Sequence, residues 1–157
     1  MSNSALRSEA SISPFKIGEE ISREVTFETD AIKHFATLVG DMNPLHHDEE
    51  FAKSSRYGGV IASGTHTSSA MMGVIASFIS GRASAVGLVF SFKMKKAIRA
   101  GEKARIVWRI VSIEYKASLG GDIVTFEGEM LNADGQIAVS ATCGNLIFKN
   151  KAPGGVR

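Results

Sequence analysis

In the second half of the chain, apolar and polar residues alternate over four long segments, a pattern typical of β-strands with one buried face. These segments are rich in β-branched and aromatic residues, and short turns containing glycine separate them. They predict strands over residues 87–95, 104–116, 122–131 and 136–148. Because the connections are short, the four strands should pair as an antiparallel meander.

The first half of the chain predicts one strand and three helices. Residues 21–28 alternate like the later strands, whereas residues 31–40 and 48–55 show the apolar spacing or capping residues of short helices. Residues 63–82 are mostly small or apolar and lack proline, which predicts one buried helix of about four turns. Its buried face is assigned to residues that recur at helical spacing: Thr65, Ser69, Met72, Ile75, Ala76 and Ile79. The order of elements defines an α+β domain, with an antiparallel sheet of about five strands wrapped around a long central helix.

Length and composition favour one globular domain with loose ends. A chain of 157 residues suits a single domain, and 44% hydrophobic with 22% charged residues is ordinary for a folded protein. The polar residues 1–13 and the last residues, 150–157, are predicted to be flexible. The folded domain is therefore expected over residues 14–149.

Charge and cysteine content narrow the partners and the compartment. The net charge is only +2 and no basic block is interleaved with aromatic residues, so nucleic-acid binding is not expected. The single cysteine, Cys143, lies in an apolar run, which predicts a buried thiol in the reducing cytoplasm. No stretch has the length and hydrophobicity of a signal peptide or a membrane span, so we expect a cytoplasmic protein without membrane contact.

The stretch GDMNPLHHDEEFA, residues 40–52, concentrates the side chains with candidate chemistry. Pro44 stiffens the chain between Asp41 and His46, so both side chains could reach one small volume. A carboxylate and a neutral imidazole placed together can hold a water molecule and remove its proton. Two other interpretations stay open: a plain turn, because Asp, Asn and Pro are typical turn residues, and a metal site. The metal site is the weaker, because adjacent histidines such as His46 and His47 rarely reach the same ion, and no metal is expected.

The same region resembles the MaoC-like hydratases, the (R)-specific enoyl-CoA hydratase group of the hot-dog fold. Their signature has the form F-A-x-x-x-G-D-x-N-P-x-H-x-D-x-x-x-A. Every fixed position is matched here, by Phe35, Ala36, Gly40, Asp41, Asn43, Pro44, His46, Asp48 and Ala52. The resemblance extends from about Gly18 through Phe148, and it implies a single hot-dog domain.

The resemblance implies a lyase that adds water by syn addition to a 2-enoyl-CoA, giving (R)-3-hydroxyacyl-CoA, or that dehydrates a carrier-protein thioester in reverse. Asp41 and His46 would hold and deprotonate the water, while Asn43 and Pro44 would support their loop. A backbone N–H at Gly64, at the start of the central helix, would stabilise negative charge on the thioester oxygen. No separate cofactor is expected, because coenzyme A is part of the substrate.

The wall of the substrate site departs from the family pattern. The family usually has a histidine before the glycine of the helix start and a bulky apolar residue after it, where this chain has Ser63 and Thr65. The family's next signature, F-x-x-P-v-x-x-G-D, has Met94, Ala97 and Glu102 in place of its Phe, Pro and Asp. These changes concern the acyl pocket, and we expect Met94 in the core or in the lining of that pocket.

Further candidates surround the expected site. Ser63, Thr65 and His66 are candidate pocket residues, although the sequence favours His66 as a core histidine bonded to backbone. A basic group is a candidate for contacts with the phosphates of coenzyme A or of a carrier protein, or else forms a solvated strand end: Lys93, Lys95, Lys96 and Arg99. His47 is expected to point away from His46 into solvent.

Two other classes of function stay open, an acyl-CoA thioesterase and a non-catalytic acyl-thioester-binding protein. Thioester hydrolysis is common on the hot-dog fold, and an altered pocket could hold a ligand without reaction. For each class we expect a homodimer, or a higher oligomer of dimers. A single sheet leaves edge strands that need covering, and hot-dog domains resemble one another in pairing their sheets edge to edge.

Overall fold

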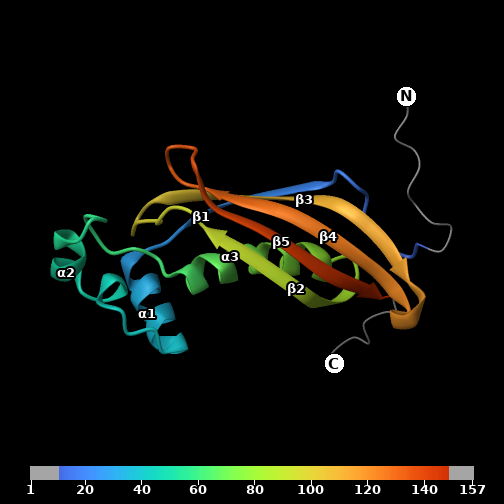
Figure 1. The fold of residues 1–157 in the computed structure, drawn as a ribbon, viewed down its shortest axis with the longest axis horizontal. Helices are drawn as coiled ribbons and strands as arrows, with labels where there is room; N and C mark the ends of the chain where they lie inside the picture. The colour runs from blue at the N-terminus through green and yellow to red at the C-terminus, as the bar shows by residue number, and fades with distance from the viewer. Residues whose placement is uncertain (1–10, 149–157) are drawn as a thin grey trace.

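The computed structural model describes residues 11–148, and these residues have the predicted α+β architecture (Figure 1). Their strands are β1 (Glu20–Thr26), β2 (Ser84–Met94), β3 (Lys103–Lys116), β4 (Gly121–Leu131) and β5 (Ile137–Phe148). All these strands pair antiparallel in one sheet, in the order β1-β3-β4-β5-β2. Strands β3, β4 and β5 are consecutive neighbours, as a meander requires.

One part of the predicted topology is wrong: β2 does not pair with β3. It pairs with β5, at the opposite edge of the described sheet from β1. The connection from β2 to β3 runs along the chain that precedes the central helix, where the N–H of Ala62 donates to the carbonyl of Ile98 at 2.9 Å. The N–H of Ala100 donates to the carbonyl of Val60 at 2.8 Å. A connection over residues 95–102 is long enough to cross three strand spacings of about 4.8 Å each, so its shortness did not force adjacent pairing.

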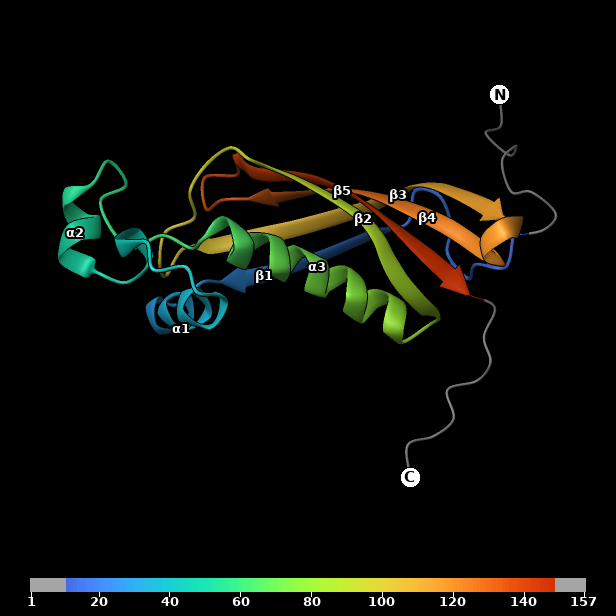
Figure 2. The same cartoon turned by 60° about the horizontal axis from the view of Figure 1, so that its bottom comes forward.

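The central helix, α3 (Gly64–Ser80), lies along one face of the sheet (Figure 2). Its buried residues repeat every three or four positions: Thr67, Met71, Val74, Ile75 and Ile79. Nε1 of the fully buried Trp108 donates to the carbonyl of Met71 at 3.0 Å and ties β3 to this helix. The predicted buried face is only partly right, because Thr65, Ser69 and Ala76 are exposed. Small residues carry little preference for either side, so the Met, Val and Ile positions decide which face packs.

The shorter helices gather at one end of the sheet, beyond the start of α3 (Figure 1). They are α1 (Thr29–Val39), a 3-10 helix (Pro44–His46) and α2 (Glu49–Ser54). No helix in the described part of the chain is long and apolar enough to cross a membrane. Gly40 ends α1 with a φ of 76°, a left-handed conformation that glycine adopts without strain. The chain therefore turns sharply from α1 into the stretch that contains the candidate residues.

The first described residues are held by Asp122, at the start of β4. Its fully buried carboxylate accepts hydrogen bonds from the backbone N–H groups of Ile12 and Ser13, at 2.8 and 2.6 Å. Both residues belong to the segment predicted to be flexible. The sequence does not indicate that Asp122, about 110 residues later, is their hydrogen-bond partner. The remaining parts of the two predicted flexible ends, residues 1–10 and 150–157, lie outside the described residues.

Candidate active site

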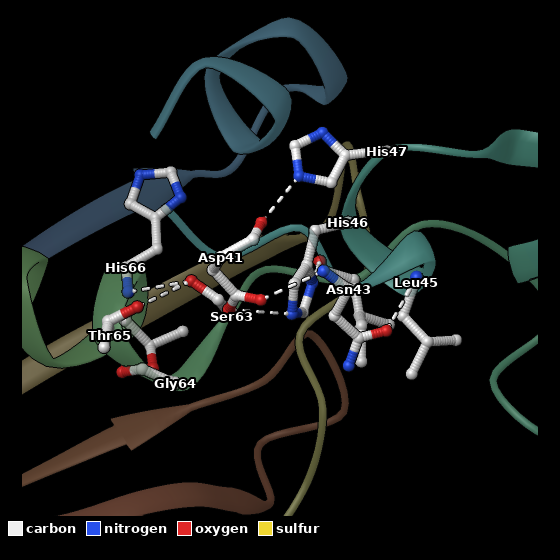
Figure 3. Close-up of polar contacts among 11 residues, drawn as sticks. Asp41, Asn43, Leu45, His46, His47, Ser63, Gly64, Thr65 and His66 are labelled. Atoms are coloured by element: carbon white, nitrogen blue, oxygen red, sulfur yellow. Dashed lines mark hydrogen bonds and ion pairs between the residues drawn. The ribbon is translucent and has the colours of Figure 1, made fainter. Parts of the chain in front are cut away.

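Local hydrogen bonds fold the loop after α1 and bring Asp41 back toward His46 (Figure 3). Oδ1 of Asp41 accepts from the backbone N–H of Asn43 at 3.2 Å. The side-chain oxygen of Asn43 accepts in turn from the backbone N–H of Leu45 at 3.1 Å. Pro44 begins the 3-10 helix, where its fixed φ and its missing N–H both suit the geometry. Two successive turns thus close the loop through its own side chains.

Asp41 and His46 together form a pair of proton acceptors. Nε2 of His46 lies 3.5 Å from Oδ2 of Asp41. On its other side, Nδ1 of His46 contacts the carbonyl oxygen of Ile61 at 2.8 Å, and it must be the donor because a carbonyl only accepts. In the neutral ring the proton therefore sits on Nδ1, and Nε2 presents a lone pair toward Asp41. One water molecule could donate a hydrogen to each of these two acceptor atoms.

The two members of the pair differ in their exposure. The side chain of His46 is 8% exposed, whereas that of Asp41 is 34% exposed. The imidazole is thus held from inside the protein, while the carboxylate remains open to solvent.

His47 contacts the loop, contrary to the prediction that it points into solvent. Its Nε2 donates to the backbone carbonyl of Asp41 at 2.7 Å, and its side chain is partly buried. His46 ends the 3-10 helix and His47 is its C-cap, and the two rings approach Asp41 from different sides (Figure 3). Gly40, in its left-handed conformation, turns the chain directly before Asp41, and the sequence marked this turn only by the glycine.

The start of α3 presents an unused backbone donor. Oγ of Ser63 caps this helix by accepting from the N–H of His66 at 3.2 Å, and it bonds to Oγ1 of Thr65 at 3.0 Å. Ser63 and Thr65 are therefore occupied in the cap, and neither lines the cavity beside His46. Gly64 does line that cavity, and its N–H has no acceptor in the part of the chain that the structure describes. The helix dipole makes this N-terminus electropositive.

His66 lies among aromatic rings and is not one of the residues that line this cavity. It stacks on Phe35 with ring centroids 4.3 Å apart and 3° between the planes, and it meets Phe27 edge-on at 4.9 Å. Nδ1 of His66 is buried without a hydrogen-bond partner among the described residues. Burial lowers the pKa of His66 below its ordinary value, because the charged ring would lose its hydration.

A cavity of about 650 Å³ adjoins the Asp41–His46 pair. Part of its lining lies near the pair and consists of His46, Gly64, Thr67 and Met94. Another part is basic and consists of Arg56, Lys95, Lys96 and Arg99. Of the predicted phosphate contacts, Lys93 lies elsewhere, in a hollow that Arg109 and Glu127 also line. Successive side chains of a strand face opposite sides of the sheet, so Lys93 points away from α3 while Met94 points toward it.

Two parts of this cavity were not predicted from the sequence. Arg56 and Tyr57, in the turn before α3, line the cavity, and the Arg56 guanidinium lies 5.1 Å from the centre of the Tyr57 ring. The β4–β5 hairpin also lines it, and Glu102 joins this hairpin to the turn before β3 by accepting from the N–H groups of Arg99 and Ala133, at 2.9 and 3.0 Å. The cation next to an aromatic residue in RYGG could have pointed to the first part. The second depends on where the hairpin lies in the folded sheet.

The loop does not gather metal ligands. Among the described residues, no three His, Cys, Asp or Glu side chains lie close enough to share a metal ion. The carboxylate of Asp48 caps α2 by accepting from the N–H of Phe51 at 2.9 Å. The loop instead places Nε2 of His46 beside Oδ2 of Asp41.

Comparisons with known proteins identify the family. A family model described as "MaoC like domain" matches residues 14–120. The chain belongs to the MaoC-like domain family. This match confirms the family resemblance carried by the loop signature.

Relatives of this MaoC-like protein span most of its length. A "UPF0336 protein" of Streptomyces avermitilis is 29% identical over 136 residues, which cover 82% of this chain and 81% of the relative. The solved structure of a MaoC-like dehydratase from Rhodospirillum rubrum is 25% identical, with a TM-score of 0.75, over 88% of this chain and 96% of the other. An (R)-hydratase from A. caviae, 20% identical with a TM-score of 0.75, covers 84% of this chain and 96% of its own. These likenesses confirm the hot-dog fold.

Proposed function

We propose that this MaoC-like protein is an (R)-specific hydro-lyase that adds water to a trans-2-enoyl thioester and catalyses the reverse dehydration of the (R)-3-hydroxyacyl thioester. The observation that carries the proposal is the hydrogen bond from Nδ1 of His46 to Ile61, which leaves Nε2 as a base 3.5 Å from the Asp41 carboxylate. Membership of the MaoC-like family and the likeness to a MaoC-like dehydratase support this class of reaction.

In hydration, the pair would act on one water molecule held between Nε2 of His46 and Oδ2 of Asp41. The water oxygen bonds to Cβ of the enoyl group while one water proton passes to the pair. The π electrons of the double bond move onto the thioester as an enolate. The pair then returns a proton to Cα on the same face, which completes the addition of H and OH without a redox partner.

The enolate oxygen needs a hydrogen-bond donor, and Gly64 is our candidate. Its N–H is unpaired in the described chain, it lies at the positive end of α3, and it shares a cavity with His46. Removal of one such donor typically slows turnover by about 10²–10³-fold, so this group would make a large contribution. Asn43 and Pro44 would act through the loop that positions Asp41 and His46.

The acyl group would be carried on coenzyme A or on the phosphopantetheine of a carrier protein, both of which contain phosphate. Lys95, Lys96 and Arg99 line the cavity, and none of them forms an ion pair within the described residues. Their charges would therefore be available to phosphate groups. Coenzyme A would be part of the substrate, and the proposed reaction requires no separate cofactor.

The exposed edge of the sheet supports a homodimer, from which a higher oligomer could be built. Strand β2 is an edge strand of the described sheet, and its Val86, Leu88 and Val89 are 47%, 46% and 64% exposed. Pairing β2 of two copies would cover these side chains and continue the sheet. A place in cytoplasmic fatty acid metabolism fits this activity and the buried free thiol of Cys143.

The test is a spectrophotometric assay with crotonyl-CoA and longer trans-2-enoyl-CoA substrates. Hydration removes the ultraviolet absorbance of the conjugated enoyl thioester. Asp41→Asn and His46→Ala should each lower kcat/KM by about 10²–10⁴-fold, the usual contribution of a general acid–base group, with the wild-type circular dichroism spectrum retained. Near-native turnover in both variants would refute the proposed pair.

The same assay separates the alternatives. Release of free thiol from the substrate would indicate a thioesterase. Binding of acyl-CoA with neither reaction would indicate a non-catalytic binding protein. Coupling the product to an (R)-specific or an (S)-specific 3-hydroxyacyl-CoA dehydrogenase determines the stereochemistry of the added hydroxyl.

A further inference from the structure

Three hydrogen bonds orient Asp41, one at each of its backbone polar groups and one at its carboxylate. Its N–H donates to the carbonyl of Ala36 in α1 at 2.8 Å, and its Oδ1 accepts from the N–H of Asn43 at 3.2 Å. Its carbonyl accepts from Nε2 of His47 at 2.7 Å. The remaining atom, Oδ2, lies 3.5 Å from Nε2 of His46. Because the side chain of Asp41 is 34% exposed, its direction depends on these bonds more than on packing.

His47 supplies the bond that fixes the peptide plane after Asp41. Each peptide unit is a rigid plane, so the backbone of a residue is set by the planes on its two sides. The plane before Asp41 is held through its N–H by the carbonyl of Ala36. In the plane after Asp41, the N–H of Met42 has no acceptor among the described residues, so the carbonyl bonded to His47 is the group that holds it. The direction in which the Asp41 side chain leaves the backbone therefore depends on His47.

A closed turn presents the His47 ring to this carbonyl. The N–H groups of His47 and Asp48 both donate to the carbonyl of Pro44, at 3.2 and 2.9 Å, and the His47 side chain is partly buried. The ring meets Asp41 from a different side than His46 does (Figure 3). Since a carbonyl only accepts, the contact requires an N–H at the position of Nε2. A side chain without a donor there could not make it.

The contact is a feature of this chain and not of the family signature. That signature leaves position 47 unspecified, between the fixed positions of His46 and Asp48. His47 is also absent from the lining of the cavity beside His46. Any effect of His47 on the reaction must therefore pass through Asp41.

We propose that His47 is a positioning residue, which directs the Asp41 carboxylate toward His46 by holding the Asp41 carbonyl. The inference rests on the proposed function, in which Asp41 and His46 act on one water molecule. Without the bond from His47, the peptide plane after Asp41 can turn, and Oδ2 moves away from Nε2 of His46. Loss of the bond slows the reaction of the bound substrate and leaves substrate binding unchanged, because His47 does not line the cavity.

Steady-state hydration of crotonyl-CoA by His47→Phe tests the contact, because phenylalanine keeps a planar ring and removes the donor. Ala36 and Asn43 still hold Asp41 in this variant, so the displacement should be smaller than the shift of about 1 Å that typically costs about 10²-fold in rate. We expect kcat to fall by about tenfold, with KM within about twofold of the wild type. His34→Phe, which changes an exposed histidine of α1, is the control and should match the wild type.

His47→Gln and His47→Asn form a matched pair of amides. The amide nitrogen of glutamine can reach the place of Nε2, so His47→Gln should restore kcat to within about threefold of the wild type. The amide of asparagine is one bond shorter and falls short of the Asp41 carbonyl, so His47→Asn should lose kcat as His47→Phe does. His47→Asn also takes the place of His47→Phe in the test if the phenylalanine prevents folding, as judged by circular dichroism.

Crystal structures of the wild type, His47→Asn and His47→Gln test the position of Asp41 without the reaction. The distance from Oδ2 of Asp41 to Nε2 of His46 should grow by about 0.5 Å in His47→Asn, the displacement that a tenfold loss in rate implies. It should stay at the wild-type value in His47→Gln. An Asp41 carboxylate that keeps its place in His47→Asn overturns the inference.

The outcomes separate this inference from the proposed function. Hydration by the wild type, with kcat unchanged in His47→Phe and His47→Asn, overturns the inference and keeps the hydratase. An equal loss of kcat in His47→Asn and His47→Gln also overturns the inference, because the hydrogen bond would then not be the cause. A wild-type protein that hydrates no enoyl-CoA overturns the hydratase, and the position of Asp41 in the crystal structures then decides the inference alone.

Discussion

The loop of Asp41 and the wall of the adjoining cavity are built from the chain in opposite ways. Within the loop, Asp41 bonds to Asn43 and to His47, and these contacts join residues two and six positions apart. The wall combines the turn before α3, the end of β2 and the β4–β5 hairpin. These segments lie far apart in the sequence and meet only once the sheet has formed.

This difference suggests that the loop and the cavity wall have separate roles in turnover and in binding. The loop is held by hydrogen bonds among its own residues and by one from His46 to the carbonyl of Ile61, so a change within it should alter the positions of the reacting groups and therefore the rate. The wall contacts parts of the substrate that do not react, so a change there should alter affinity and leave the rate of the bound complex nearly unchanged.

Among the changes that test these separate roles, Asn43→Ala is expected to have the largest effect on kinetics. The change removes the oxygen that accepts from the N–H of Leu45, yet it leaves both proposed catalytic side chains in place. Asp41 and His46 would then hold the water less accurately, and a misplacement of about 1 Å typically costs about 10²-fold in rate. In steady-state hydration assays we expect kcat to fall by about 10- to 100-fold, with KM within about threefold of the wild type.

Asn43→Asp is the matched control for this prediction. A carboxylate oxygen can accept the same bond from the N–H of Leu45, so the variant should keep most of its activity. An Asn43→Ala variant with a raised KM and a normal kcat would contradict these separate roles, because the loop would then act on binding.

An intermediate effect is expected in the basic part of the wall. Lys95→Ala and Lys96→Ala each remove a charge that lines the cavity, so KM for an enoyl-CoA should rise by about two- to tenfold with kcat unchanged. High salt should reduce this difference, because it screens exposed charges. Lys93→Ala is the control, since Lys93 lies on the other face of the sheet and should have no effect. An equal rise in KM for Lys93→Ala would mean that overall charge, and not the cavity, attracts the substrate.

The same contrast explains how much the sequence could predict. Alternation located the strands and helical spacing located the long helix, because the buried residues of each element recur at a fixed spacing along the chain. The pairing of β2 with β5 could not be predicted, because the length of a connection does not decide which edge of the sheet the next strand joins.

At the candidate site, local residues were again the more predictable. Asp41 and His46 could be expected together, because a proline and short-range turns limit the chain between them. Lys93 was grouped with Lys95 and Lys96 by position alone, and only the orientation of β2 separates them. The adjacent cation and aromatic ring of Arg56 and Tyr57 could suggest a binding stretch, but only the fold shows that they line the same cavity as His46.

The smallest effect concerns a residue outside both regions, and it appears as a pH dependence of stability. His66 stacks on Phe35 with a buried, unpartnered Nδ1, and burial lowers its pKa from the ordinary value of 6.5. In the unfolded chain the ring takes up a proton as the pH falls below about 6.5, whereas the folded state resists this proton. The contribution of neutral His66 to the free energy of unfolding is therefore present above that pH and is lost as the pH falls through the lowered pKa.

His66→Phe keeps a ring that can stack on Phe35 and removes the proton-binding group. Urea denaturation at pH 7.5 and pH 5 should show an advantage of this variant over the wild type that grows at the lower pH. His34→Gln, which removes an exposed histidine and leaves the aromatic cluster intact, should keep the acid sensitivity of the wild type. An advantage of His66→Phe that is equal at both pH values would mean that the ring packs better but that its protonation does not affect folding. Because His66 belongs neither to the loop nor to the cavity wall, either result should leave kcat and KM at pH 7.5 nearly unchanged.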